Sequence, residues 1–269
     1  MGNVNTIKRG GSRFYVEPTS GHKAPGVTSI ISMLPKPFLQ YWSARKTAEA
    51  AADNLDVVNA LAERDRDALV DFLKAAPTRY TKSRQNLGTA AHDMFERQIR
   101  GEDVRRVGPD LAPYKRHFAE FLDRVQPELI SAEDVMWSDA HDYAGSSDVI
   151  MRITDPETGL PEIVIGDWKT SKDTYPDVSL QLTAYKNADR IISADGSSRP
   201  MPAIQAGAVL HVTDERWALK PVEVSDRVFG VFLALRQVFD WDRQMSKEVI
   251  GKAIESGGRL ESGTERRAK

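Results

Sequence analysis

The spacing of apolar residues divides the chain into a helical first half and a strand-rich second half. Residues 85–100 repeat apolar side chains at the three- and four-residue spacing of an amphipathic helix, and Gly101 is a natural end for it. The same spacing predicts helices over residues 38–54, 65–75 and 109–125. We expect Pro77 to break the chain before the helix at 85.

A change to period two marks the start of a sheet. Glu162–Lys169 carries the β-branched run of a buried strand, and residues 129–137 and 143–153 are predicted to be the two strands before it. Residues 155–159 are a turn by composition, so 143–153 and 162–169 form a hairpin. The register that we expect sets Asp148 beside Asp167.

The remaining elements complete an α/β pattern. They are a helix over 177–192, strands over 203–212 and 217–222, and a helix over 225–245. We therefore expect a mixed central sheet flanked by helices, with a helical N-terminal half. The predicted divisions are an N-terminal strand and helical region over 1–84, a core over 85–245, and a flexible tail over 246–269, which has few apolar residues.

Composition excludes several classes of protein. The 269-residue chain has no cysteine, so neither a disulfide nor a thiolate-held iron–sulfur cluster is possible. No apolar run approaches the ~20 residues of a membrane span, and the first residues lack the apolar core of a signal peptide. We therefore expect a cytoplasmic protein with no membrane partner. The net charge of -2 argues against a uniformly basic surface but leaves room for a local basic patch.

The chemistry-bearing residues gather around the predicted hairpin. Asp167 and Lys169 are two residues apart on one strand, so both side chains point to the same face, while Trp168 points into packing. Two carboxylates with a lysine suit a magnesium ion, which prefers oxygen ligands and activates water against phosphodiesters. The alternative is an ordinary surface hairpin with an Asp–Lys ion pair.

Three motifs together resemble a known superfamily. Gly145-Ser146-Ser147-Asp148, Asp167-Trp168-Lys169, and Gln181 followed by Tyr185 are similar to the motifs of the PD-(D/E)XK nucleases, most of all the RecB-like and bacteriophage exonuclease branch. Gly88 to His92 resembles the upstream histidine helix of that branch, and the likeness extends over roughly 25–190. The chain departs from several RecB-like members in lacking the four cluster-binding cysteines.

The resemblance implies a restriction-endonuclease-like fold and roles for individual residues. Asp148 and Asp167 match the metal-binding acids, Lys169 the catalytic lysine, and Gln181 the helix glutamine near it. We expect Asp148, Asp167, the main-chain carbonyl of Trp168 and His92 to hold one or two Mg²⁺ or Mn²⁺ ions. Glu133 has two possible roles. It could be an added metal ligand, or it could pair with an arginine at the strand edge, which is the role that we favour. His141 and His211 are expected to be structural or exposed.

The expected DNA contacts lie on both sides of this site. Arg79, Lys82 and Arg84 form a basic segment before the His92 helix, which Arg105, Arg106, Lys115 and Arg116 extend; a solvated helix start would look the same. Thr170 and Lys172 directly follow the lysine, and Tyr185 follows Gln181 on its helix.

The sequence therefore predicts a Mg²⁺- or Mn²⁺-dependent deoxyribonuclease. The phage relatives imply an exonuclease that acts in recombination or replication beside a single-strand annealing partner, although motif spacing does not separate exonuclease from endonuclease. Two other functions remain open: a module that holds DNA ends or a recombination protein without cutting, and a hydrolase of RNA or nucleotides.

Overall fold

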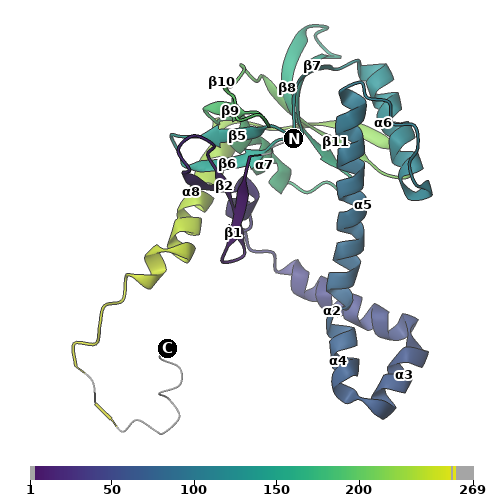
Figure 1. The fold of residues 1–269 in the computed structure, drawn as a ribbon, viewed down its shortest axis with the longest axis vertical. Coiled ribbons are helices and arrows are strands. Elements are labelled where there is room, and N and C mark those ends of the chain that lie inside the picture. The colour runs from purple at the N-terminus through teal and green to yellow at the C-terminus, as the bar shows by residue number, and fades with distance from the viewer. Residues whose placement is uncertain (1–3, 256, 259–269) are drawn as a thin grey trace.

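The computed structural model describes residues 4–255 and 257–258 of a mixed α/β protein (Figure 1). Its largest sheet has five strands in the order β12-β11-β8-β7-β4. These strands are β4 (Glu128–Ala132), β7 (Val149–Thr154), β8 (Pro161–Lys169), β11 (Ala206–Val212) and β12 (Trp217–Val222). Only the β8–β11 pair is parallel among these described strands, and α7 (Asp177–Lys186) lies between the two in the chain. The predicted mixed sheet, the β7–β8 hairpin and the 217–222 strand are confirmed.

The described residues also form two smaller sheets. One has the order β10-β9-β5-β6 and contains β5 (Val135–Ser138), β6 (Tyr143–Ser146), β9 (Arg190–Ile192) and β10 (Ser198–Pro200). The other is formed by β1 (Thr6–Arg9), β2 (Ser12–Val16) and β3 (Lys23–Pro25).

Two of the connections between the five-stranded and four-stranded sheets are only two residues long. Residues 133–134 separate β4 from β5, and residues 147–148 separate β6 from β7. The two crossings are hydrogen-bonded to each other, since the Glu133 N–H donates to the Asp148 carbonyl and the Ser147 N–H to the Asp134 carbonyl. The predictions of single continuous strands over 129–137 and 143–153 are therefore wrong, because each stretch changes sheets in its middle.

The helices of the structure are α1 (Val27–Ile31), α2 (Phe38–Asp53), α3 (Leu55–Arg64), α4 (Arg66–Lys74), α5 (Ala76–Ile99), α6 (Ala112–Val125), α7 and α8 (Asp226–Arg243), with short 3₁₀ turns at Pro109–Leu111 and Met245–Lys247. Pro77 does not break the chain: it lies in the first turn of α5, where a missing N–H leaves no helical hydrogen bond unmade. The helix predicted over 177–192 ends at Lys186 instead, and the β-branched Ile191 and Ile192 are buried in β9.

Apolar side chains cover both faces of the five-stranded sheet. Ile150, Ile165 and Val209 join residues of α1, α7 and α8 on one face. Val149, Trp168 and Leu210 join residues of α5 and α6 on the other, where the Trp168 ring meets Phe118 edge-on at 5.3 Å. Neighbouring residues of a strand thus enter opposite cores, as period two predicts, and Trp168 is packed away from the Asp167 side.

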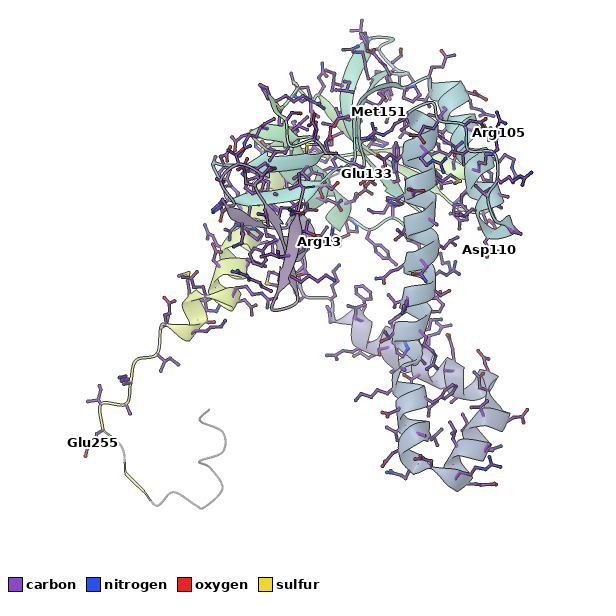
Figure 2. The ribbon with its side chains drawn as sticks, in the orientation of Figure 1. Arg13, Arg105, Asp110, Glu133, Met151 and Glu255 are labelled. Atoms are coloured by element: carbon purple, nitrogen blue, oxygen red, sulfur yellow. The ribbon has the colours of Figure 1, made fainter. Side chains whose placement is uncertain are left out.

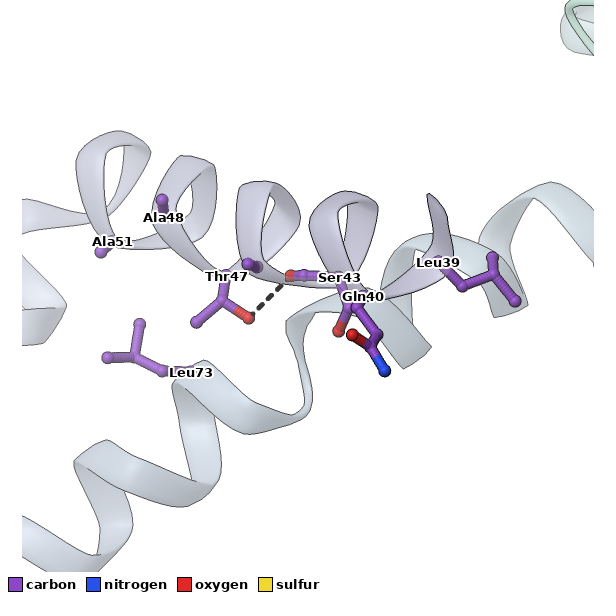
Figure 3. A pocket seen from close by; sticks show the side chains of 8 residues that line it. Leu39, Gln40, Ser43, Thr47, Ala48, Ala51 and Leu73 are labelled. Carbon is purple, nitrogen blue, oxygen red and sulfur yellow. Dashed lines mark hydrogen bonds between the residues drawn. The ribbon is translucent and has the colours of Figure 1, made fainter. Parts of the chain in front are cut away.

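The helices α2, α3 and α4 with the first half of α5 form an arm that projects from the sheets (Figure 1). Within these described helices, none of the residues of α2, α3 or α4 is buried. An open apolar groove runs between α2 and α4 (Figure 3), lined by Leu39, Ala44, Ala48, Ala51 and Leu73 among others. The predicted 84/85 division falls inside the continuous helix α5.

The structure bears only partly on two further expectations, which are the absence of a membrane span and a flexible tail. No described helix is long and apolar enough to cross a membrane. The predicted flexible tail begins at residue 246, but residues 256 and 259–269 lie outside the described part of the chain.

Candidate active site

The β7–β8 register brings the two predicted acids together. Val149 pairs with Gly166, so Asp148 and Asp167 are the next residues on facing chains. The approach requires a glycine, because a Cβ at Gly166 would lie 2.6 Å from a methyl carbon of Val149. Asp148 stands just before its strand, where its Oδ2 accepts a 2.6 Å hydrogen bond from the Trp168 main-chain N–H. The carboxylate is therefore fixed by the backbone of the strand that carries Asp167.

Asp167 is the most buried acid of the site, with 2% of its surface exposed. Its Oδ1 accepts a 3.0 Å hydrogen bond from Gln181 Nε2, and its Oδ2 forms an ion pair with the Lys169 ammonium. That Oδ2 is buried, and the Lys169 ammonium is its only charged partner among the described side-chain contacts. Burial, reinforced by the charge of Asp148, raises the pKa of Asp167 above its usual range despite Lys169.

Gln181 is held in place from behind by Tyr185. The two residues lie one turn apart on α7, and the Gln181 amide is 3.4 Å from the Tyr185 hydroxyl. Tyr185 is 2% exposed and its ring packs on Gly145, where a Cβ would come within 2.6 Å of the ring. Tyr185 therefore supports Gln181 from within the core, and the structure does not place it on a surface that DNA reaches.

His92 approaches from α5 on the other side of Asp148. Its Nδ1 lies 3.5 Å from Asp148 Oδ2, and Gly88, one turn earlier, lets the helix come close to Thr170. Burial acts to lower the pKa of His92, but the hydrogen bond and negative charge of Asp148 outweigh it, and the pKa is raised. His92, which we predicted as a metal ligand, thus lies next to Asp148.

Glu133 belongs to the same site, in a role that the sequence prediction ranked second. Its side chain lies beside the upper part of α5 (Figure 2), and it forms no ion pair with any arginine in the described chain. Ser146 Oγ donates to its carbonyl oxygen at 3.1 Å and lies 3.4 Å from its Oε2. Burial, followed by the charges of Asp148 and Glu96, raises the pKa of Glu133 to about 7. The favoured pairing with an arginine is therefore wrong.

Three of these side chains have the geometry of a metal-binding group. His92, Glu133 and Asp148 each offer one ligand atom, and the three atoms lie within 4.8 Å of one another. One nitrogen and two carboxylate oxygens suit a divalent cation. The residues present therefore fit a metal ion, with Glu133 in the set and Asp167 tied more closely to Lys169 and Gln181.

The segment after Lys169 is pinned by His211. His211 pairs with Lys169 across β8 and β11, is 7% exposed, and lies with its Nε2 2.7 Å from the Ser171 carbonyl oxygen. Its Nδ1 is 3.4 Å from the Lys220 ammonium, which also donates to Thr174. Of the two roles expected for His211, structural or exposed, the structure shows the structural one. No sequence motif pointed to this network. Within the segment, Thr170 is half-buried and Lys172 is exposed.

The predicted basic residues fall into two separate groups. Arg79, Lys82 and Arg84 are exposed on the first half of α5. A second group lines a groove beside α6 and contains Arg105, Arg106, Lys115 and Arg116. In Figure 2 the labelled Arg105 and Glu133 lie on opposite sides of α5.

Comparison with known proteins adds nothing to this geometry. No protein-family model matches the chain, and no curated protein matches it. What the arrangement can do is therefore argued from its own residues: it can bind a divalent cation, hold a lysine ammonium beside a buried carboxylate, and present both to a phosphate.

Proposed function

We propose that this protein is a metal-dependent deoxyribonuclease of the PD-(D/E)XK superfamily, with a restriction-endonuclease-like core. The observation that supports the proposal best is the convergence of Asp148, Asp167 and Lys169 with Gln181 and His92 from two helices. These elements are far apart in the sequence. Their meeting at one end of β7 and β8 is unexpected for a surface hairpin with a simple ion pair.

Each residue has a defined task in the proposed reaction. His92, Glu133 and Asp148, with Asp167 beside them, would hold a Mg²⁺ or Mn²⁺ ion. When bound, such an ion supplies a nucleophilic water at neutral pH and neutralises charge on the phosphate. The main-chain carbonyl of Trp168 is proposed as a further ligand of this ion.

Lys169 and Gln181 complete the site. The Lys169 side chain is 31% exposed, so its ammonium can contact both Asp167 and a phosphate oxygen, where it would balance developing negative charge. Gln181 fixes the orientation of the Asp167 carboxylate through its 3.0 Å hydrogen bond. Thr170, Lys172 and the arginines of α5 are proposed to contact the DNA backbone.

We infer exonuclease action from the resemblance to phage exonucleases, with a role in recombination or replication. The proposal includes a single-strand annealing protein as a partner, because resection by an exonuclease produces the strand that such a protein binds.

The direct test of substrate class uses three labelled nucleic acids side by side. Linear duplex DNA, a covalently closed duplex circle and single-stranded RNA are incubated with Mg²⁺, Mn²⁺ or EDTA. The proposal predicts metal-dependent release of nucleotides from the linear DNA only. Cutting of the circle would indicate an endonuclease, and preference for RNA would replace the DNA substrate. Intact DNA in both metals would contradict the nuclease proposal and favour a DNA-holding module.

A further inference from the structure

The first half of α5 carries a local positive charge in a chain whose net charge is -2, although the rest of the arm, α2 to α4, also contains acidic residues. Residues 72–92 contain Lys74, Arg79, Lys82 and Arg84 and no aspartate or glutamate. Arg79 donates to the Phe72 carbonyl, and none of Arg79, Lys82 and Arg84 forms an ion pair with another described residue. Their positive charge is therefore uncompensated and available to an anionic ligand.

Aromatic side chains stand among these cations where α2 meets α5. The Trp42 and Tyr80 rings meet edge-on at 6.0 Å, and the Lys46 ammonium lies 4.1 Å from the centre of the Tyr80 ring. Arg84 lies 5.8 Å from the same ring, and Tyr80 is 42% exposed. Glu49 offsets part of this charge, since it pairs with Arg45 and Lys46 on α2. Basic groups interleaved with accessible rings form the combination that binds a nucleic-acid strand through phosphates and stacked bases.

Helix α5 connects this face rigidly to the candidate active site. Tyr80 and His92 lie on the same uninterrupted helix, twelve residues apart. At the helical rise this is about 18 Å, or about five nucleotides of a stacked strand. The far half of α5 is buried against the sheet through Ala91, Met94 and Phe95, so the separation is fixed.

We propose that the arm face formed by Trp42, Lys46, Tyr80, Lys82 and Arg84 is a second nucleic-acid site, which binds single-stranded DNA about five nucleotides from the point of cleavage. The DNA identity of the ligand rests on the proposed function, but binding at the arm does not require cleavage. The uncompensated cations supply phosphate contacts, and Tyr80 supplies a stacking surface. A single strand is favoured over a duplex because only unpaired bases expose faces to a ring.

Binding of a 5′-fluorescein-labelled dT12 oligonucleotide to the full chain, followed by fluorescence anisotropy in EDTA, tests the arm separately from the nuclease. We expect the Lys82→Glu/Arg84→Glu variant to bind at least tenfold more weakly. The Lys82→Ala/Arg84→Ala variant should lower the slope of log Kd against log salt by about 1.4, since each lost phosphate contact on a single strand removes about 0.7. Arg64→Glu, a single charge reversal on α3, should change binding less than about twofold.

The stacking contribution has its own pair of variants. Tyr80→Leu should weaken dT12 binding about tenfold, whereas Tyr80→Phe, which keeps the ring, should bind like the parent chain. Unchanged dT12 affinity in the charge variants, or equal loss in Arg64→Glu, would overturn the arm site. If the arm variants lost binding to duplex DNA but not to dT12, the proposed preference of the arm for a single strand would be overturned. Arm-dependent dT12 binding in a chain that cuts no DNA would keep the arm site while rejecting the nuclease.

Discussion

Glu133 combines a left-handed backbone with a carboxyl group whose proton is held unusually tightly. Its φ of 55° costs a non-glycine residue on the order of 1 kcal/mol, and its pKa is raised to about 7 by burial and neighbouring acids. A stability-driven sequence would avoid both. A role in the candidate metal group would account for both features, since a bound cation would relieve the repulsion between Glu133 and Asp148.

The raised pKa of Glu133 predicts a pH-dependent stability of the metal-free protein. The folded chain binds this proton more tightly than the unfolded chain, so the associated stability is complete below about pH 4.5 and is lost as pH rises to about 7. Glu133→Gln removes the titration. Its unfolding free energy relative to the parent chain should rise by on the order of 3 kcal/mol between pH 4.5 and pH 8.

Urea unfolding in EDTA at pH 4.5, 6 and 8 measures this difference. A Glu157→Gln variant, which alters a carboxyl group in the exposed β7–β8 turn, should show no such change with pH. If the Glu133→Gln difference stays flat with pH, then Glu133 is not buried among acids in solution.

At the scale of elements, the junction of β6 with α7 positions the glutamine of the site. A Cβ at Gly145 would meet the Tyr185 ring at 2.6 Å, and Tyr185 in turn lies behind Gln181. Gly145→Ala is therefore expected to destabilise the fold by about 1–3 kcal/mol. In a Tyr185→Leu background, which lacks the contacting ring atoms, most of that cost should disappear.

Urea unfolding of the four members of this double-mutant cycle gives the coupling energy directly. Gly230→Ala on α8, where an added Cβ meets nothing within 4 Å, is the control and should be neutral or stabilising. Equal costs of Gly145→Ala in both backgrounds would contradict the proposed contact.

The elements show which parts of the site can be predicted from sequence. Asp167 and Lys169 follow from period two within one strand, and Asp148 follows from a hairpin whose turn is visible in the composition. These inferences need only local geometry. Gln181 and His92 were assigned by resemblance to known motifs, and the structure places both against the acids.

The remainder depends on long-range structure that no local pattern encodes. The change of sheet at residues 133–134 and 147–148 is set by pairing with distant strands, so Glu133 could not be located beside His92 from spacing alone. Likewise, Ile191 and Ile192 continue a helical pattern in the sequence, but they form a strand that pairs with β5 on one side and β10 on the other. Tertiary contacts override local preference in both cases.

At the scale of the whole molecule, one helix links an exposed arm to a buried site. The core on both faces of the five-stranded sheet fixes the acids, while the arm contributes no buried residue from α2, α3 or α4 as described. From this division we predict that metal ions bind to the core, whereas DNA binds to both the core and the arm.

A bound metal ion should therefore stabilise the whole fold. Mn²⁺ at a hundred times its Kd adds about 2.7 kcal/mol by mass action and should raise Tm by about 5 °C in a thermal melt. The shift should shrink strongly in Asp148→Asn and Glu133→Gln but persist in the surface variant Glu157→Gln. A Tm that is indifferent to Mn²⁺ and Mg²⁺ would mean that the three-residue group does not bind these ions.

The central claim is that Asp167 and Lys169 carry out metal-dependent hydrolysis of DNA. The most direct measurement is the rate of nucleotide release from linear duplex DNA in Mg²⁺ by the parent chain, Asp167→Asn, Lys169→Ala and the exposed control Lys8→Ala. We predict cleavage by the parent and Lys8→Ala, and a loss of about 10²–10⁴-fold in the other two with unchanged circular dichroism. Full activity in either site variant would contradict the assigned site.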